Sequence, residues 1–257
     1  MSVVSKLQDF VLSLKPEISR SSGGSVLMDK GKDIKIKLDV ELNRKIVGFL
    51  RKNFDYDVLS EEESDGEDFT EFESFYWIVD PLDGSLNYSR GIPLYCVSIA
   101  LWKGMEPVLG VIFDHNRGEL FIGGAVEVAE LGIKKGACRN GERVHVSDRG
   151  GMADGVLATG FPSFRSYTRE SLLRFVDRVR MWKKVRLFGS AALSLAWVAC
   201  GRCDAYVEED IRIWDVAAGL AIVKAAGGEV NVGVNKKRKN YVTAVATNGK
   251  IKVGDVL

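Results

Sequence analysis

The chain of 257 residues carries a formal net charge of +1 and is 46% hydrophobic and 28% charged, which is typical of a folded globular protein with a large core. A net charge near zero excludes a global field that selects nucleic acid or membrane surfaces, and no apolar run approaches the roughly 20 residues of a membrane-spanning helix. We therefore expect a cytoplasmic protein of one or two domains, with neither nucleic acid nor membrane as a partner.

The first half of the chain predicts two helices and a series of strands. Residues 1–14 form one helical stripe of apolar side chains and do not resemble a secretory signal. A turn is expected at 21–25, followed by a strand at 33–39 that ends in Asp39 and by a helix from about residue 40. Further strands are predicted at 56–60, 75–80, 95–102, 107–114 and 118–124.

In the second half of the chain, predicted helices alternate with predicted strands. The helices are expected at 169–182, 190–200 and 215–228, and the strands at 183–188, 204–208, 229–232 and 242–248, with a basic turn at 236–239. This change of pattern indicates two packed α/β units, and we place their boundary so that the domains are residues 1–148 and 149–257.

The cysteines and histidines do not suggest a catalytic or zinc site. Cys200 and Cys203 follow an apolar helix, with Gly201 as its expected C-cap, and no second cysteine pair completes a zinc site. The chain has only two histidines, and neither has a convincing acidic neighbour. Histidine-based catalysis is therefore disfavoured.

Acidic residues stand where the predicted strands end or a helix begins. They are Asp39, Glu61, Glu62, Asp80, Asp83 and Asp215. Strand ends and helix starts of an α/β protein converge on one crevice, so we expect these carboxylates to meet. Such a group repels itself unless hard cations are bound, and oxygen ligands without clustered His or Cys favour Mg²⁺ over zinc.

Each acid also has a simpler explanation when it is considered alone. Asp39 and Asp215 suit helix N-caps, residues 61–63 suit an exposed acidic loop, and residues 80–85 suit a turn rich in Asp, Pro and Gly. The recurrence of the same context along the chain favours the shared site.

Gly84 and Ser85 indicate what this site binds. They follow Asp83 directly and are expected to begin a helix whose backbone N–H groups face the crevice. The N-terminus of a helix binds anions, phosphate above all. Metal ions next to such a group of N–H donors favour phosphoryl chemistry, in which two metals hold a phosphate and activate water.

At this point the residues resemble a known family. The stretch WIVDPLDGSLNY at 77–88 is similar to the first signature of the inositol monophosphatase family, W-x-x-D-P-[IL]-D-G-[ST]-x-N-[FY]. WDVAAGLAIVKAAGG at 214–228 resembles its second signature, VLSEEES at 58–64 its Glu–Glu segment, and RLFGSAALSLAWVACGRCDAYVE at 186–208 its substrate-side helix and strand. The resemblance extends over roughly residues 33–248.

The resemblance implies a fold and a metal set. The fold is the family's layered α/β/α/β/α sandwich, which it shares with fructose-1,6-bisphosphatase among the Mg²⁺-dependent, Li⁺-sensitive phosphatases, usually as a homodimer. Glu61, Asp80 and the Leu82 carbonyl correspond to ligands of a first Mg²⁺, and Asp80, Asp83 and Asp215 to ligands of a second. A third, weaker Mg²⁺ is implied near Glu61, so that the subunit holds two or three ions.

The resemblance also implies catalytic and substrate-binding roles. Asp39 and Ser85 correspond to the acid–hydroxyl pair that helps to activate water, Glu62 to a residue that orients water, and Asp83 to one that steers a proton to the leaving alkoxide. The implied substrate-binding residues are Gly84, Ser85, Gly189, Ser190, Ala191 and Glu208. With these roles, residues 1–148 form the metal- and phosphate-binding domain, and residues 149–257 the substrate-side domain.

The sequence departs from the family pattern at two points that concern the site. Ser85 replaces the commoner threonine, which keeps the hydroxyl but loses the methyl group that limits its rotamers. Three successive glutamates at 61–63 leave the register of the Glu–Glu pair ambiguous. We assign Glu61 and Glu62 to the pair, because 58–60 then match the preceding strand.

The expected function is Mg²⁺-dependent hydrolysis of inositol 1-phosphate or a related sugar phosphate, a small-molecule phosphate monoester. Fructose 1,6-bisphosphate, 3′-phosphoadenosine 5′-phosphate and NADP are alternative substrates on the same scaffold, with Arg165 or Arg169 as the residue that meets a second phosphate. Glu208 favours a neutral polyol, because it would repel a second phosphate at its position. A catalytically inactive binding protein is a further alternative, although every expected metal acid is present.

Overall fold

The larger of two main sheets is built from residues 57–144. The computed structural model describes residues 2–20, 26–30, 33–63, 66–161 and 167–253. Within them, seven strands hydrogen-bond in the order β3-β4-β5-β6-β7-β8-β9, with β3 parallel to β4 and the other neighbours antiparallel. Their bounds are Asp57–Ser60, Phe75–Asp83, Cys96–Lys103, Glu106–Asp114, Glu119–Gly124, Gly136–Arg139 and Glu142–Val144.

The two faces of this sheet belong to two different apolar cores. Along β4, Tyr76 and Ile78 pack into the core on one face, whereas Trp77 and Val79 pack into the core on the other. Successive side chains of a strand point to opposite faces, so a strand that is apolar at every position has to be covered on both sides. The run FYWIV therefore places β4 in the interior.

The second sheet is built from residues 156–247. Its order is β11-β10-β12-β14-β13, with bounds Lys184–Arg186, Val156–Ala158, Ala205–Arg212, Tyr241–Thr247 and Glu229–Val234. β10 is parallel to β11 and β12, and the remaining pairs are antiparallel. The basic run 236–239 lies in the turn between β13 and β14, as expected from the sequence. A separate hairpin joins β1 (Val26–Lys30) to β2 (Asp33–Ile36).

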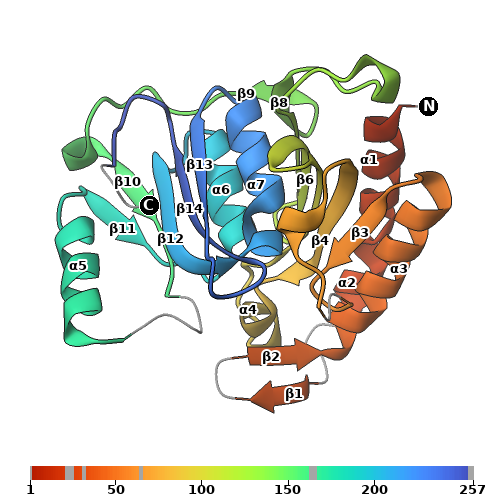
Figure 1. Ribbon diagram of the computed structural model, residues 1–257, viewed down its shortest axis with the longest axis horizontal. Coiled ribbons are helices and arrows are strands. Elements are labelled where there is room, and N and C mark those ends of the chain that lie inside the picture. The colour runs from red at the N-terminus through yellow and green to blue at the C-terminus, as the bar shows by residue number, and fades with distance from the viewer. Residues whose placement is uncertain (1, 21–25, 31–32, 64–65, 162–166, 254–257) are drawn as a thin grey trace.

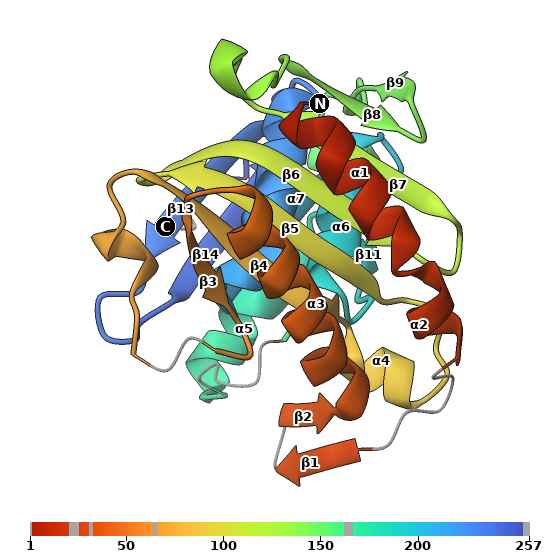
Figure 2. The same cartoon turned by 90° about the vertical axis from the view of Figure 1, so that its right-hand side faces the viewer.

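Helices complete a five-layer arrangement around these two sheets (Figure 1). α6 and α7 lie between the sheets, and α1 and α3 cover the outer face of the larger sheet (Figure 2). α5 lies beyond the smaller sheet. The helices are α1 Val3–Ser13, α2 Lys15–Arg20, α3 Lys37–Asn53, α4 Ser85–Ser89, α5 Arg169–Val179, α6 Ala191–Ala199 and α7 Ile213–Ala225, with short 3₁₀ turns at Phe69–Glu71, Ala129–Leu131 and Met152–Asp154. This confirms the predicted α/β/α/β/α sandwich.

The sequence prediction was wrong about where the strand at 33–39 ends. β2 stops at Ile36, and α3 begins at Lys37, so Asp39 lies in the first turn of a helix. Its carboxylate accepts a hydrogen bond of 2.9 Å from the Ile36 N–H, which supplies one of the partners that a helix start lacks. The turn predicted at 21–25 lies outside the described residues.

Four strands were not predicted. One of them is β1, the partner of β2. β8, β9 and β10 have four, three and three residues and contain too few positions to show an alternation of apolar and polar side chains. They form because neighbouring strands offer unpaired backbone groups, which is a tertiary effect.

The boundary predicted near residue 148 separates the two sheets but not the cores. Every strand of the larger sheet precedes it and every strand of the smaller sheet follows it. α7, from the second half, nevertheless packs on β4, β5, β6 and β7 of the first, within one apolar cluster that spans both halves. Two independent domains therefore stay a prediction.

Glycines allow α7 to approach its neighbours closely. A Cβ atom on Gly110 of β6 would lie 2.1 Å from the Ala218 carbonyl oxygen, and one on Gly219 would lie 2.3 Å from the Leu195 Cβ of α6. Both distances are far below van der Waals contact. The position of α7, which carries Asp215, therefore depends on these small residues.

No helix in the described part of the chain has the length and apolar character that crossing a membrane requires.

We expect Gly110→Ala to lower the free energy of unfolding by about 2 kcal/mol or more, because its methyl group overpacks the contact with α7. Gly48→Ala is the matched control: Gly48 is exposed within α3, with nothing near its added Cβ, and alanine should stabilise the helix by about 0.5–1 kcal/mol. Chemical denaturation of both variants measures the two opposite shifts, and a Gly110→Ala protein as stable as the parent would contradict the proposed close packing.

Candidate active site

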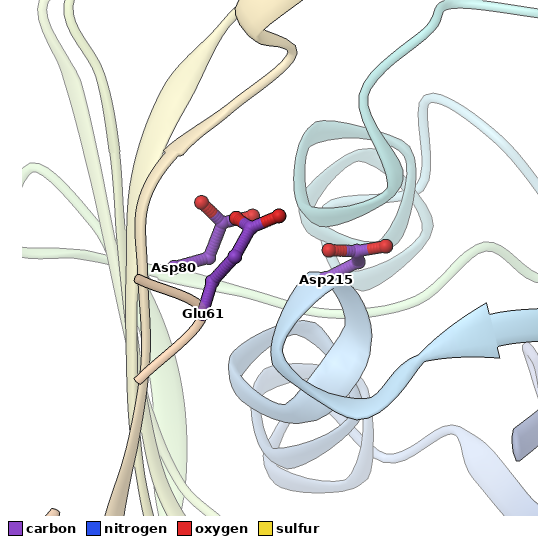
Figure 3. A group of neighbouring side chains, drawn as sticks. All are labelled: Glu61, Asp80 and Asp215. Carbon is purple, nitrogen blue, oxygen red and sulfur yellow. The ribbon is translucent and has the colours of Figure 1, made fainter. Parts of the chain in front are cut away.

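Three carboxylates from distant parts of the chain meet between the larger sheet and α7. Glu61 follows β3, Asp80 lies in β4 and Asp215 lies in the first turn of α7. One oxygen of each lies within 4.8 Å of the others. Figure 3 shows the Glu61 and Asp80 side chains extending from the sheet toward Asp215 at the start of the helix. The structure thus brings together three of the acids that the sequence singled out.

A β-bulge explains how Asp80 and Asp83 both serve this side of the sheet. Residues separated by an odd number of positions face opposite sides of a regular strand. Asp80 pairs with Ser98 and Asp83 with Cys96, so three steps along β4 match two along β5. The extra residue restores the phase, and Asp83, like Asp80, is directed toward the helices between the sheets.

The crowding of these acids raises their pKa values. The pKa of Glu61 is raised to about 8, with burial as the largest cause and repulsion from Glu62 next. Because the Glu61 side chain is exposed, repulsion from the neighbouring carboxylates is the stronger physical reason for this rise in pKa. The pKa values of Asp80 and Asp215 lie well above the ordinary aspartate value, through burial first and then repulsion from Glu61. Arg212 acts in the opposite direction on Glu61 and Asp215.

The donor set fits a hard divalent cation. It consists of carboxylate oxygens, which Mg²⁺ prefers, and it contains neither imidazole nor thiolate. A divalent cation among the three oxygens would replace their repulsion by attraction and would lower the raised pKa values. Glu61, Asp80 and Asp215 are therefore suited to holding a metal ion.

Asp83 is fixed by the beginning of α6. Its Oδ2 accepts a hydrogen bond of 2.5 Å from the Ser190 hydroxyl and one of 2.7 Å from the Ala192 N–H. Burial raises the pKa of Asp83 to about 6, and these hydrogen bonds oppose the rise. The sequence prediction assigned Ser190 to the substrate, but its hydroxyl also connects α6 to the end of β4.

Asp39 and Ser85 form the predicted pair. The Ser85 hydroxyl lies 3.0 Å from Asp39 Oδ1 and 2.8 Å from the Leu82 carbonyl oxygen, so it can donate its one proton to either. Asp39 is buried and anchored by the Ile36 N–H at its other oxygen. Asp39 therefore contacts Ser85 as predicted, although it lies in a helix and not in a strand.

Gly84 allows the chain to turn from β4 into α4. It has a φ of 89° and is the residue before the helix. A Cβ atom there would lie 2.6 Å from the Leu94 carbonyl oxygen, so only glycine fits both the backbone conformation and the space. The predicted helix begins at Ser85, although it spans only five residues.

Of the three glutamates at 61–63, Glu61 and Glu63 point in different directions. Glu63 accepts hydrogen bonds from Asn43 (2.8 Å) and Arg51 (3.3 Å) on α3, away from the acidic cluster. Glu62 is half-buried and near enough to Glu61 to raise its pKa. This geometry favours the assignment of Glu61 and Glu62 to the site.

The predicted substrate side is formed by the loop before α6 and by β12. Gly189, with a φ of 70°, precedes Ser190 and Ala191 at the start of α6. Glu208 of β12 is buried, accepts a 2.7 Å hydrogen bond from the Tyr206 hydroxyl and contributes to the raised pKa of Asp215. Glu208 therefore lies near enough to Asp215 for the two carboxylates to repel.

Sequence reasoning did not assign a role to Asn87 or Tyr206. The Asn87 amide donates to the carbonyl oxygens of Leu94 (2.8 Å), Phe188 (2.8 Å) and Gly189 (3.2 Å), and so joins α4 to the substrate-side loop. The place of Asn87 in the first signature was the available signal, and Tyr206 lies within the stretch 186–208 that resembles the substrate-side strand. Of the two arginines considered for a second phosphate, Arg165 lies outside the described residues, and Arg169 begins α5.

Comparison with known proteins agrees with this geometry. The model of the inositol monophosphatase family matches residues 8–250. A protein named Nus factor SuhB from Xylella fastidiosa is 41% identical over 205 residues, which are 79% of this chain and 69% of that protein. A protein named fructose-1,6-bisphosphatase/inositol-1-monophosphatase from Thermotoga maritima is 38% identical over 200 residues, 77% and 71% of the two chains.

The solved structures give the same picture. The extragenic suppressor protein SuhB from Bartonella henselae superimposes with a TM-score of 0.80 at 31% identity, over 96% of this chain and 94% of its own. The family model and the relatives that are named as phosphatases identify the class of protein as phosphoric monoester hydrolases. The chain belongs to the inositol monophosphatase family.

The raised pKa of Glu61 predicts how metal-free stability depends on pH. Between pH 4.5, which is the ordinary pKa of a glutamate, and about pH 8, Glu61 keeps a proton in the folded protein that it releases in the unfolded chain. The free energy of unfolding therefore falls as the pH rises through this window. We expect Glu61→Gln to make the free energy of unfolding depend less steeply on pH. Glu63→Gln, a change outside the cluster, should leave this dependence unchanged. Urea unfolding in EDTA across the window measures both, and equal slopes for the parent and Glu61→Gln would disprove the assignment.

Proposed function

We propose that this chain is a Mg²⁺-dependent phosphomonoesterase that hydrolyses inositol 1-phosphate or a related sugar phosphate with water. The observation that carries the proposal is the convergence of Glu61, Asp80 and Asp215 within 4.8 Å. The buried acid Glu208, near enough to Asp215 to raise its pKa, supports a hydroxyl-rich substrate, because a carboxylate accepts hydrogen bonds from hydroxyl groups and repels a second phosphate.

The proposed metal ligands are the carboxylates of Glu61, Asp80, Asp83 and Asp215 and the carbonyl oxygen of Leu82. They would hold two Mg²⁺ ions, with a third near Glu61. When bound, the ions would neutralise charge on the phosphate and make a bound water more acidic. As a metal ligand, the Leu82 carbonyl oxygen would no longer accept the hydrogen bond from the Ser85 hydroxyl. That hydroxyl would then donate to Asp39.

Asp39 and Ser85 would take the proton of the attacking water. The proton passes to the Ser85 oxygen as the Ser85 hydroxyl proton passes to Asp39 Oδ1, 3.0 Å away. Asp39 is suited to this because its other oxygen is anchored on the Ile36 N–H, so the accepting oxygen is held in position. Glu62 would orient the water from the opposite side.

Asp83 would act on the leaving group. The Ser190 hydroxyl and the Ala192 N–H hold its Oδ2, which orients the carboxylate. From this position it steers the water that protonates the leaving alkoxide. A pKa raised to about 6 keeps Asp83 mostly ionised at neutral pH and able to accept a hydrogen bond from that water.

The backbone N–H groups of Gly84 and Ser85 would donate to the phosphate oxygens, since the chain turns sharply there and leaves them without partners in a preceding turn. Gly189, Ser190 and Ala191 would line the pocket for the alcohol, with Glu208 accepting from one of its hydroxyl groups. The Asn87 amide donates to the carbonyl oxygens of Leu94 and Gly189, so it holds the segment after α4 against the loop before α6.

A bisphosphate substrate is the second candidate. The relative from Thermotoga maritima carries fructose-1,6-bisphosphatase in its name together with inositol-1-monophosphatase. The 3′-phosphonucleotide and NADP alternatives have the same chemistry at the scissile phosphate. A homodimer and a cytoplasmic location also belong to the proposal.

Phosphate release from inositol 1-phosphate, fructose 1,6-bisphosphate, 3′-phosphoadenosine 5′-phosphate and NADP tests this function directly. We expect release in Mg²⁺, its loss in EDTA and the highest kcat/KM for inositol 1-phosphate. Asp83→Asn should lower turnover about 100-fold or more, because a steering carboxylate is lost, while circular dichroism shows an intact fold. Turnover that persists in EDTA, or at near-parental levels in Asp83→Asn, would count against the proposal.

Ser85 offers a matched pair of variants for the water-activating pair. Ser85→Ala removes the donor to Asp39 and should lower kcat about tenfold or more, since a hydrogen bond to a charged group contributes about 1.5–3 kcal/mol. Ser85→Thr keeps the hydroxyl and should retain most activity. If both variants lose activity equally, the hydroxyl is not what matters at this position.

A further inference from the structure

The outer face of the larger sheet contains a cavity of about 370 Å³ that the proposed chemistry does not use. Its walls come from the beginning of α1, from β6 and β7, and from the β8–β9 hairpin. Figure 2 shows the N-terminal end of α1 beside β8 and β9. The volume lies within the range of small-molecule sites, roughly 300–1,000 Å³.

This cavity and the acidic cluster lie on opposite faces of the sheet. Leu109 and Ile122 line the cavity and belong to the core under α1. The next residues along the same strands, Gly110 and Gly123, face α7 instead. A molecule in the cavity is therefore separated from Asp215 by the thickness of the sheet, and it would not compete with substrate for space.

The floor of the cavity is apolar. Leu109 and Ile122 are almost fully buried side chains at its base, and the half-buried Val4 of α1 forms one side. Cys138, half-buried and with a free thiol, lines it as well. Such a floor favours a ring or a short aliphatic chain over a fully hydrated ion.

The rim of the cavity is positively charged. Lys134, Lys135 and Arg143 line it, and no acidic side chain does. Among the residues that the structure describes, none of the three forms an ion pair, whereas Arg139 of the same hairpin pairs with Glu119 at 3.5 Å. Three cations around one apolar floor, without an internal counter-charge, complement an anion.

Glycines shape the rim so that the cations stay at its edge. A Cβ atom on Gly124 would lie 2.2 Å from the Lys134 carbonyl oxygen, so the lysine segment passes directly over the end of β7. Gly136 has a φ of 135°, and the Arg143 guanidinium lies 3.4 Å from where its Cβ would be. Gly132 allows a similar approach to Ser2, at 2.9 Å.

We propose that this cavity binds a small organic anion with an apolar ring or chain. The apolar part lies on Leu109 and Ile122, and a carboxylate, sulfonate or phosphate group lies among Lys134, Lys135 and Arg143. The site is distinct from the phosphatase site and does not depend on the proposed function.

Fluorescence titration with anilinonaphthalene sulfonate, an aromatic anion, provides the first test. We expect saturable binding to the folded parent, competition by naphthalene sulfonate and far weaker competition by the uncharged naphthalene methanol. Lys134→Gln combined with Arg143→Gln should weaken binding about tenfold, because each partly exposed charge contributes a few-fold. The charge-matched control combines Lys183→Gln with Lys236→Gln, two exposed lysines outside the cavity, and should change affinity less than about twofold.

Cys138 provides a readout that locates the probe. Modification by dithiobis(nitrobenzoate), followed by peptide mass spectrometry, should show that the probe protects Cys138 but not Cys200, the other half-buried cysteine. Equal losses of affinity in both double variants, or a probe that leaves Cys138 unprotected, would overturn the proposal. So would protection of Cys138 without probe that grows with protein concentration, which would indicate that a second copy of the chain covers this face.

Discussion

Carboxylates held within a few ångströms of one another repel, and the repulsion strengthens where water is scarce. In this protein Glu61, Asp80 and Asp215 are brought to within 4.8 Å by two strand ends and a helix start, and burial together with their mutual repulsion raises their pKa values. Folding therefore works against the repulsion of its own side chains. The fold keeps them together because α7 is packed so closely against the sheet that it has no room to move away.

That packing also joins the two sheets that carry the site residues. The acids of β3 and β4 come from the larger sheet, whereas Glu208 comes from the smaller one, and the shared core of α6 and α7 sets the distance between them. Two polar connections reinforce it: Asp83 to the start of α6, and Asn87 to the loop that precedes it. A change at either connection would alter the substrate side and the metal side together.

The larger sheet presents different chemistry on its two faces. Toward α7 it carries acids suited to cations, and toward α1 it carries an apolar cavity with a basic rim suited to anions. A strand can serve both faces because its side chains alternate, and β6 does so with Leu109 on one side and Gly110 on the other. The near-zero net charge of the chain hides this separation, so composition alone gave no sign of it.

The sequence by itself determined the long elements and the identity of the acids. FYWIV had to be a buried strand, and residues 191–199 are apolar apart from Ser194, as a helix enclosed by two sheets requires. The resemblance of 77–88 to a family signature then located Asp80, Asp83 and Ser85. Only the tertiary structure decided that Asp39 starts a helix, that a bulge turns Asp83 to the same side as Asp80, and that Asn87, Tyr206 and the β8–β9 hairpin find their partners. These features depend on contacts between residues far apart in the chain, and no local pattern of side chains encodes them.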